Sequence, residues 1–150
     1  MSLQTDIVFV KALRSNAQLI AKLPAGDVYN PAIALPDEEL DNAEVPYIII
    51  SFDGLNNQDT TKDDSYEGCT DMVTIGMEIA AKTRPQLAEL AIMARKTIAE
   101  YFQQHVGDEQ DEDFALIPNS YTFSAQAVQY DSMKPCVWQR FSFSCDTNPD

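Results

Sequence analysis

The stretch MVTIGMEIAAKTRPQLAEL, residues 72–90, decides how this chain is expected to fold. In its first half, the apolar side chains that fall on every second position are Val73, Ile75, Met77, Ile79 and Ala81. Alternation with a period of two predicts a strand that turns one face toward a core. In its second half, Thr83 and Gln86 stand three apart as in a capping box, and Pro85 is tolerated in a first helical turn. The stretch therefore predicts a strand that leads directly into a helix.

That helix is expected to continue as far as Gly107, which favours helix termination. Its predicted buried stripe consists of Leu87, Leu90, Ala91, Ala94, Ile98 and Tyr101 or Phe102. The side chains that this stripe leaves to solvent are Glu89, Arg95, Lys96 and Glu100. Such a division is typical of a helix that packs against a sheet.

Upstream of this unit, Pro46 introduces the run 47–52, whose β-branched and aromatic residues favour a strand with both faces buried. Downstream, residues 121–128 and 136–145 alternate again, and 131–135 is expected to be the turn between them. The sequence thus predicts four strands. The side chains expected in the core are Tyr47, Ile49, Ile75, Ile79, Leu87, Leu90 and Trp138.

The N-terminal residues 3–22 carry apolar residues at helical spacing and predict one helix, with Ser2 as its N-cap. The members of its stripe are Leu3, Ile7, Val10, Leu13, Ala17 and Ile20. Pro24 and Gly26 are expected to end this helix, and the residues Val28 and Tyr29 read as a brief extended piece. Residues 30–44 are expected to form a loop.

The order of these elements predicts an α+β fold, with two helices packed on one face of a mostly antiparallel four-stranded sheet. A length of 150 residues and a mass of 16.7 kDa suit one domain, 1–150, with a single core. Long acidic loops are expected at about 53–71, as a mobile hairpin arm, and at 107–113. A polar tail is expected at 146–150.

The charge of the chain limits its partners. Twenty-four acidic and ten basic residues give a net charge of −14 and a pI near 4.2, which argues against a protein that grips a phosphate backbone or an anionic membrane. Residues 37–71 carry −10 of this charge and residues 107–113 carry −5. No apolar run reaches the roughly 18 residues of a membrane span, and no signal segment is visible, so synthesis in the cytosol is expected.

The sequence offers little catalytic chemistry. The one histidine, His105, is expected to lie solvated at a helix end, and no nucleophile or metal-hydrolase motif accompanies it. The cysteines Cys69, Cys136 and Cys145 are expected to be free, buried thiols. Two groups of carboxylates have the oxygen ligands that Ca²⁺ or Mg²⁺ prefers: those at 108–113, and Asp59, Asp63 and Asp64. We interpret both groups as parts of solvated loops, because runs of charge are usually exposed to solvent. We therefore expect no enzyme activity, no metal site and no cofactor; a small metal-dependent enzyme is kept as an alternative.

Four stretches of the chain carry a family resemblance: Leu3–Ile7, Asp27–Tyr29, Val45–Ser51, and the strand Val73–Ala81 that continues into Thr83–Leu90. Together with Arg95–Ile98, which continues an alternation of basic and acidic residues along the helix, they span residues 3–102. In these stretches the chain resembles the tail terminator, or tail completion, proteins of long-tailed phages and prophages, also called minor tail protein U-like.

The resemblance implies a structural virion protein that forms a hexameric ring, caps the tail tube, fixes tail length and presents a surface for joining the head. The implied partners are the tail tube protein and head–tail connector proteins, and the implied location is the virion tail, with assembly in the host cytoplasm. Six chains would carry about −84 formal charges, so DNA would pass through the lumen without specific binding. Crowded carboxylates oppose ring closure, so salt or a divalent cation is expected to promote it.

The candidate subunit or partner contacts are Asp64 and Tyr66 on the first acidic loop and Asp111 and Asp113 on the second, all expected to be exposed. Two alternatives to the terminator stay open beside the metal enzyme. One is another phage neck or head–tail joining protein, and the other is a non-viral protein-binding module that forms no ring.

Overall fold

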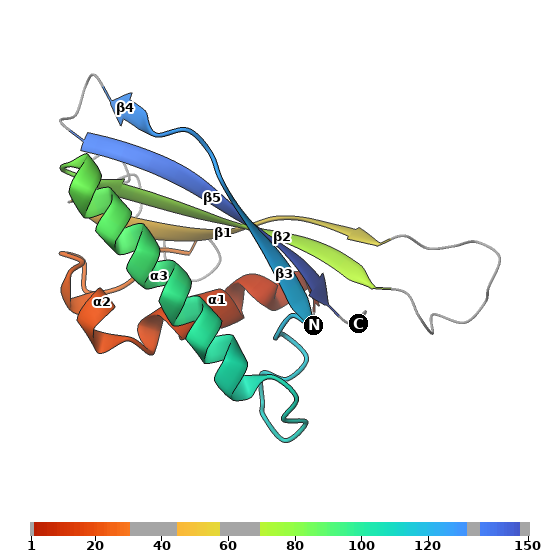
Figure 1. Cartoon of the computed structure of the whole chain (residues 1–150). Helices are drawn as coiled ribbons and strands as arrows, with labels where there is room; N and C mark the ends of the chain where they lie inside the picture. The colour runs from red at the N-terminus through yellow and green to blue at the C-terminus, as the bar shows by residue number, and fades with distance from the viewer. Residues whose placement is uncertain (1, 31–44, 58–69, 132–135, 148–150) are drawn as a thin grey trace.

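The computed structural model describes residues 2–30, 45–57, 70–131 and 136–147 (Figure 1). Its helical elements are the 3₁₀ turn η1 (Ser2–Gln4), α1 (Thr5–Arg14), α2 (Ala17–Ala21) and α3 (Arg84–His105). Its strands are β1 (Tyr47–Asn57), β2 (Asp71–Ala81), β3 (Ser120–Ala125), β4 (Gln129–Asp131) and β5 (Cys136–Thr147).

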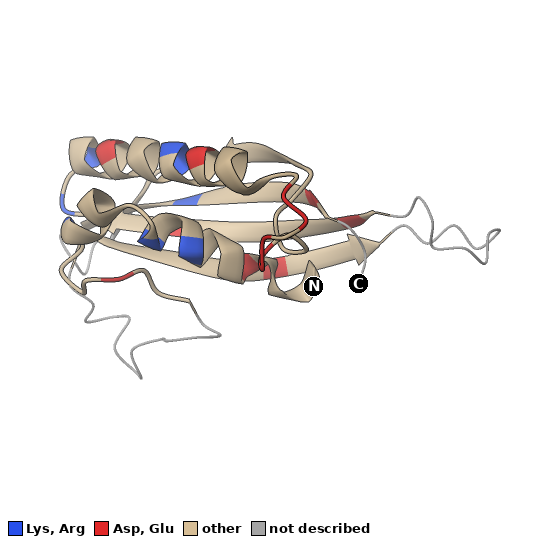
Figure 2. Ribbon diagram, turned by 90° about the horizontal axis from the view of Figure 1, so that it is seen from below, with Lys and Arg blue, Asp and Glu red and all other residues tan. Residues whose placement is uncertain are grey.

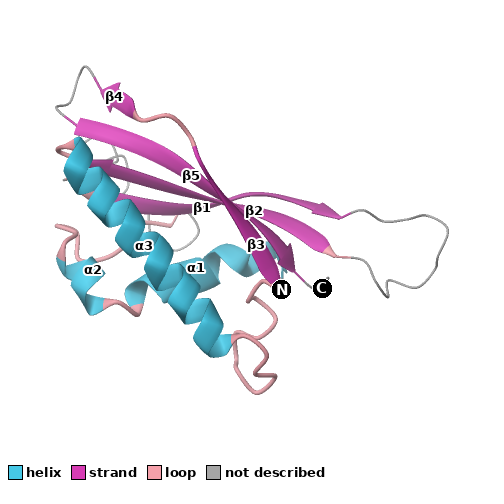
Figure 3. Cartoon of the chain, viewed as in Figure 1, coloured by secondary structure: helices cyan, strands magenta, loops and turns pink. Residues whose placement is uncertain are grey.

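The described strands form one antiparallel sheet in the order β1-β2-β5-β3, with β4 also paired to β5. Figure 3 shows α1 and α3 together beneath this sheet, and none of the described helices lies above it. The α+β class, the antiparallel pairing and the placement of the helices on one face are confirmed. The described sheet has five strands where four were expected, because the last edge is divided between β3 and β4.

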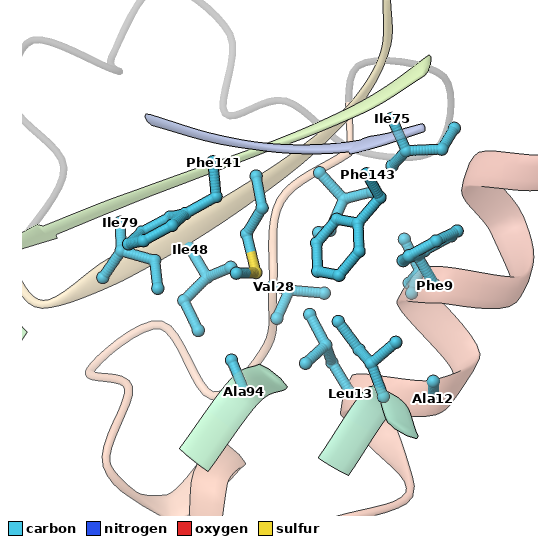
Figure 4. Close-up of a cluster of buried hydrophobic side chains, with 14 of the residues drawn as sticks. Phe9, Ala12, Leu13, Val28, Ile48, Ile75, Ile79, Ala94, Phe141 and Phe143 are labelled. Atoms are coloured by element: carbon cyan, nitrogen blue, oxygen red, sulfur yellow. The ribbon is translucent and has the colours of Figure 1, made fainter. Parts of the chain in front are cut away.

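The core lies between the sheet and the two long helices, and β2 supplies its centre. Ile75, Met77 and Ile79 have no solvent exposure, as the alternation in β2 predicts. Phe143 of β5 packs 5.0 Å from Phe9 of α1, measured between ring centroids (Figure 4). Burial of this apolar layer is the main favourable contribution to folding.

The expected single helix at 3–22 is wrong, because α1 ends at Arg14 with Ser15 as its C-cap, and Asn16 then leaves the helical conformation. Asn16 is extended, and its side-chain oxygen accepts hydrogen bonds from the backbone N–H groups of Gln18 and Leu19. Asparagine competes with a continuous helix in this way, so it caps α2 instead. Two members of the expected stripe are exposed: Leu3, in the 3₁₀ turn before α1, and Ala17, at the start of α2.

Ser2 is not the N-cap of α1. Gln4 occupies that position without a side-chain cap, and Ser2 is buried in the 3₁₀ turn that precedes it. There the Ser2 hydroxyl accepts a hydrogen bond from Thr147 Oγ1 at 3.0 Å. The N-terminal turn is thus attached to the last strand of the sheet.

The start and end of α3 confirm the sequence prediction. Thr83 Oγ1 accepts from the Gln86 N–H, and the Gln86 side chain accepts from the Lys82 N–H, while Gly107 follows the helix at φ +80°. The side chains that α3 buries are Leu87, Leu90, Ala94, Thr97, Ile98 and Phe102. Thr97 was not expected in this stripe. It is accommodated because its hydroxyl donates to Met93 O at 2.8 Å and accepts from Asn16 Nδ2 at 2.9 Å.

The strand expected at 47–52 extends to Asn57 and is buried on one face only. Ile48 and Ile50 have no exposure, whereas Tyr47 and Ile49 are half-buried. The expectation that both faces are buried, and that Tyr47, Ile49 and Trp138 are core, is therefore wrong. The brief extended piece is confirmed, since Tyr29 forms a parallel bridge to Ile49.

The strand expected at 121–128 is divided. β3 ends at Ala125, and pairing with β5 resumes at Gln129 in β4. Between them, Gln126 still donates its N–H to the Arg140 carbonyl and accepts at its own carbonyl from the Gln139 side chain. Three expected bounds are wrong, because strands occupy residues 53–57 of the first acidic loop, residue 131 of the expected turn and residues 146–147 of the expected tail. The remainder of these expectations lies outside the described residues, at 31–44, 58–69, 132–135 and 148–150.

Candidate functional site

The second acidic loop does not extend freely into solvent, because part of it binds α1. Lys11 Nζ lies 2.7 Å from Asp113 Oδ1 and 3.7 Å from Glu112 Oε1. The hydrogen bond from Lys11 to Asp113 raises the pKa of Lys11. Asp113 is only 5% exposed, so its carboxylate depends on this partner. Figure 2 shows the acidic loop beside the ends of the helices.

A second contact holds the same loop to α3. The Asp111 carboxylate accepts the Asp113 N–H at 2.9 Å and is in contact with His105 Nδ1, and these two interactions lower the pKa of Asp111. The His105 ring also lies 4.2 Å from the Tyr101 ring, measured between centroids. His105 is half-buried, which corrects the expectation of a solvated histidine at a helix end.

The four candidate contact residues therefore have different outcomes. Asp64 and Tyr66 lie outside the described residues. Asp113 is buried and Asp111 is half-buried, so the expectation that both are exposed is wrong, since each binds a side chain of its own chain. The carboxylates of this run that do face solvent are Asp108, Glu109 and Glu112.

A different polar cluster lies on the sheet face opposite the helices. Arg140 of β5 forms an ion pair with Asp53 of β1 across the intervening strand β2. Its guanidinium also lies 3.4 Å from Ser51 Oγ. Gly76 lies directly beneath, and a Cβ at that position would collide with the ends of all three side chains. A glycine inside a strand often marks such a close approach. Gly76 could therefore have predicted this cluster from the sequence, but the sequence analysis did not identify it.

Glu78 completes this cluster, because its Cα is paired with Arg140 in the register of β2 and β5. Burial raises the pKa of Glu78, and the nearby Arg140 charge opposes that rise. We define Ser51, Asp53, Gly76, Glu78 and Arg140 as the open-face cluster. It places one cation and two carboxylates on three neighbouring strands, and the cation is paired with Asp53 of the same chain.

The edge of the sheet at β3 borders a groove. Among the described residues β3 pairs with β5 alone, so its other edge is open. The groove has a volume of about 310 Å³ and separates β3 from α3; its lining includes Ala99, Phe102, Gln103, Val106, Pro118 and Tyr121. Beside it, the Arg95 guanidinium lies 4.1 Å above the Phe123 ring. We call this region the α3–β3 groove.

The described cysteines pack in the interior. Cys145 has no exposure, and burial raises the pKa of its thiol to about 12. Cys136 is also buried, and Cys69 lies outside the described residues. Within the described ranges, no three His, Cys, Asp or Glu side chains are placed to share a metal ion. No helix of the described chain has both the length and the apolar character that a bilayer span requires.

Comparison with known proteins adds no family to this description. The sequence matches no protein-family model, and a search of curated proteins found no match.

Proposed function

We propose that this protein is a phage or prophage tail terminator that caps the tail tube as a ring, stops tail growth and forms the surface for joining the head. The observation that carries the proposal is the spatial arrangement of the stretches on which the resemblance rests. They lie in η1 and α1, in the residues before Asn30, in β1, and in β2 with the start of α3. These elements are contiguous in space (Figure 1).

Hydrogen bonds join these stretches to one another. Tyr29 donates its N–H to the Ile48 carbonyl at 2.8 Å and accepts from the Ile50 N–H at 2.8 Å. Asp6 of α1 accepts a hydrogen bond from Asn30 Nδ2 at 3.0 Å. β1 then pairs with β2 along its length. The resemblance therefore rests on one folded block rather than on scattered patterns.

The surfaces of the fold also suit a subunit of an assembly. In the part of the chain that the structure describes, one sheet face has no helix over it and displays the open-face cluster, and β3 leaves a sheet edge unpaired. Such surfaces favour binding to further protein chains. In this proposal the partners are the tail tube protein and the head–tail connector proteins, and DNA passes through an acidic lumen without being bound.

The oligomeric state tests the ring. Light scattering coupled to size exclusion, at low and high salt and with magnesium, is expected to show a particle of about 100 kDa, six chains of 16.7 kDa each. Higher salt should favour the hexamer, because ions screen the repulsion between chains that each carry a net charge of −14. Electron microscopy of the same fraction should show closed rings.

Deletion of the gene from its phage or prophage tests the role. A terminator predicts tail tubes of irregular, excessive length when the protein is missing, and normal length when the gene is restored. Another neck or joining protein predicts tails of normal length that fail to join heads. A non-viral binding module predicts no effect on tails, and that result would overturn the proposal.

A further inference from the structure

The two described edges of the sheet lack the features with which soluble proteins usually protect edge strands. β3 reads SYTFSA and contains no charged residue and no proline. The distal part of β1, residues 51–57, contains one charged residue, Asp53, and that carboxylate is paired with Arg140 of the same chain. Charged side chains, lysine above all, and prolines usually prevent edges from pairing with other chains. Together the two edges carry a single charge, which is paired within the chain, although the net charge of the chain is −14.

The strand directions make these two edges compatible. β1 is antiparallel to β2, β2 is antiparallel to β5, and β3 is antiparallel to β5. β3 therefore runs antiparallel to β1. If a second copy continued the sheet in the same orientation, its β1 would meet β3 of the first copy as an antiparallel neighbour, with its helices on the same side. The lengths also agree, because β3 has six residues and the segment 51–57 has seven.

Apolar side chains next to the two edges would also meet in this arrangement. Tyr121 and Phe123 point to the helix side of β3 and are only half-buried, and Val106 beside the α3–β3 groove is 54% exposed. On β1, Leu55 is 36% exposed and opposes the buried Val73, so it too lies on the helix side. A joined sheet would place Leu55 of one copy toward the groove of the other, which removes apolar surface from water on both.

We propose that copies of this chain join head to tail through their sheets, with the outer edge of β3 in one copy pairing antiparallel to residues 51–57 of β1 in the next. The interface is heterologous, since it uses two different surfaces, and such an interface closes into a ring when its rotation permits. This inference rests on the proposed function and deepens it, because it names the surfaces through which the subunits of the ring meet.

Cross-linking between two single-cysteine variants tests this pairing. Thr122 of β3 and Asn56 of β1 are exposed, and their registers place both on the sheet face away from the helices. T122C and N56C are each made in a Cys69→Ser background, where the two remaining native thiols are buried. A short bismaleimide is then added to each variant alone and to an equal mixture.

The mixture is expected to yield covalent dimers, and the Cys69→Ser background without an added cysteine is expected to yield none. Each single variant alone should cross-link far less, because the proposed interface never brings two copies of the same position together. Dimers from T122C alone or N56C alone at the level of the mixture would overturn the head-to-tail arrangement.

A matched pair of substitutions measures the contribution of Leu55. Leu55→Gln is expected to raise the dissociation constant of self-association about tenfold or more, because its side chain would be buried at the junction. Met72→Gln is the control, since Met72 is 38% exposed but lies on the opposite face of the inner strand β2. The control should change the constant less than about twofold. Equal effects of the two substitutions would contradict the proposal.

The outcomes separate this inference from the proposed function. Rings that form without cross-links between T122C and N56C would overturn the edge pairing and leave the terminator role in place. Cross-linked open filaments, together with normal tail length after gene deletion, would support the pairing and overturn the role. A monomer at every salt and magnesium concentration, without cross-links, would overturn the pairing.

Discussion

The two faces of the sheet are built from the same strands but are stabilised in different ways. In β2, the residues that face the helices are apolar and fully buried, such as Ile75 and Met77. On the other face, Gly76 lies beneath an ion pair between Arg140 and Asp53, which come from the two neighbouring strands. The helix side is held by apolar burial. The open side combines the half-buried side chains of Tyr47, Ile49 and Trp138 with contacts between polar groups.

This difference indicates where the molecule can carry a function without losing its fold. Apolar burial contributes most of the stability, and it is concentrated on the helix side. Polar pairs near water contribute little, so residues on the open side can change with small cost. The open face and the sheet edges are therefore the regions where binding surfaces can vary.

The largest effect is expected from the helix side. Phe143→Ala should lower the free energy of unfolding by about 3–5 kcal/mol, because the Phe143 ring is fully buried against Phe9 and Phe123. Urea denaturation measures this change. The adjacent Ser142 points to the open face, and Ser142→Ala is expected to change stability by less than about 0.5 kcal/mol. Similar losses from both substitutions would contradict the difference between the faces.

A polar contact within the helix layer is expected to have an intermediate effect. Lys11→Met should destabilise the protein by about 1–2 kcal/mol, because the buried Asp113 carboxylate would lose a partner at 2.7 Å. Lys96→Met is the matched control. Lys96 pairs with Glu100 at 3.9 Å on the exposed surface of α3, so its loss should cost less than about 0.5 kcal/mol. Thermal unfolding of the two variants compares them directly.

Gly76→Ala tests how closely the polar side chains of the open face pack on the sheet. The added Cβ should push Arg140 away from Asp53 and destabilise the protein by about 1 kcal/mol, measured by urea denaturation. The same substitution in an Asp53→Ala background should cost much less, because Arg140 is then free to move. An equal cost in both backgrounds would show that the strain arises from the backbone and not from the ion pair.

The smallest effect concerns Glu78. Because burial raises its pKa, the folded protein retains the Glu78 proton to higher pH than the unfolded chain does. The resulting stabilisation is present below the ordinary pKa and is lost as the pH rises through the raised value. Glu78→Gln should therefore stabilise the protein at pH 7, by no more than about 0.5 kcal/mol, relative to its effect at pH 3. Thermal unfolding at the two pH values measures this difference, and a pH-independent effect would contradict it.

Local patterns determined much of the fold. The alternation in β2 identified its buried side, Thr83 identified the start of α3, and Gly107 identified its end. These features depend on residues close together in the sequence, because periodicity and capping are set within a few residues. The order of helices and strands along the chain predicted the α+β class and the packing of the helices on one face of the sheet.

Tertiary structure alone decided the features that join distant parts of the chain. Lys11 and Asp113 are 102 residues apart, and Arg140 and Asp53 are 87 apart, so no local pattern relates them. A contact between distant residues also contributes to the break of the N-terminal helix at Asn16, since the Asn16 side chain donates a hydrogen bond to Thr97 of α3. The sequence by itself therefore determined the class of the fold, and β2 and α3 with their buried faces. Only packing decided which acidic side chains turn inward and which edges of the sheet remain open, because these depend on where the chain returns in space.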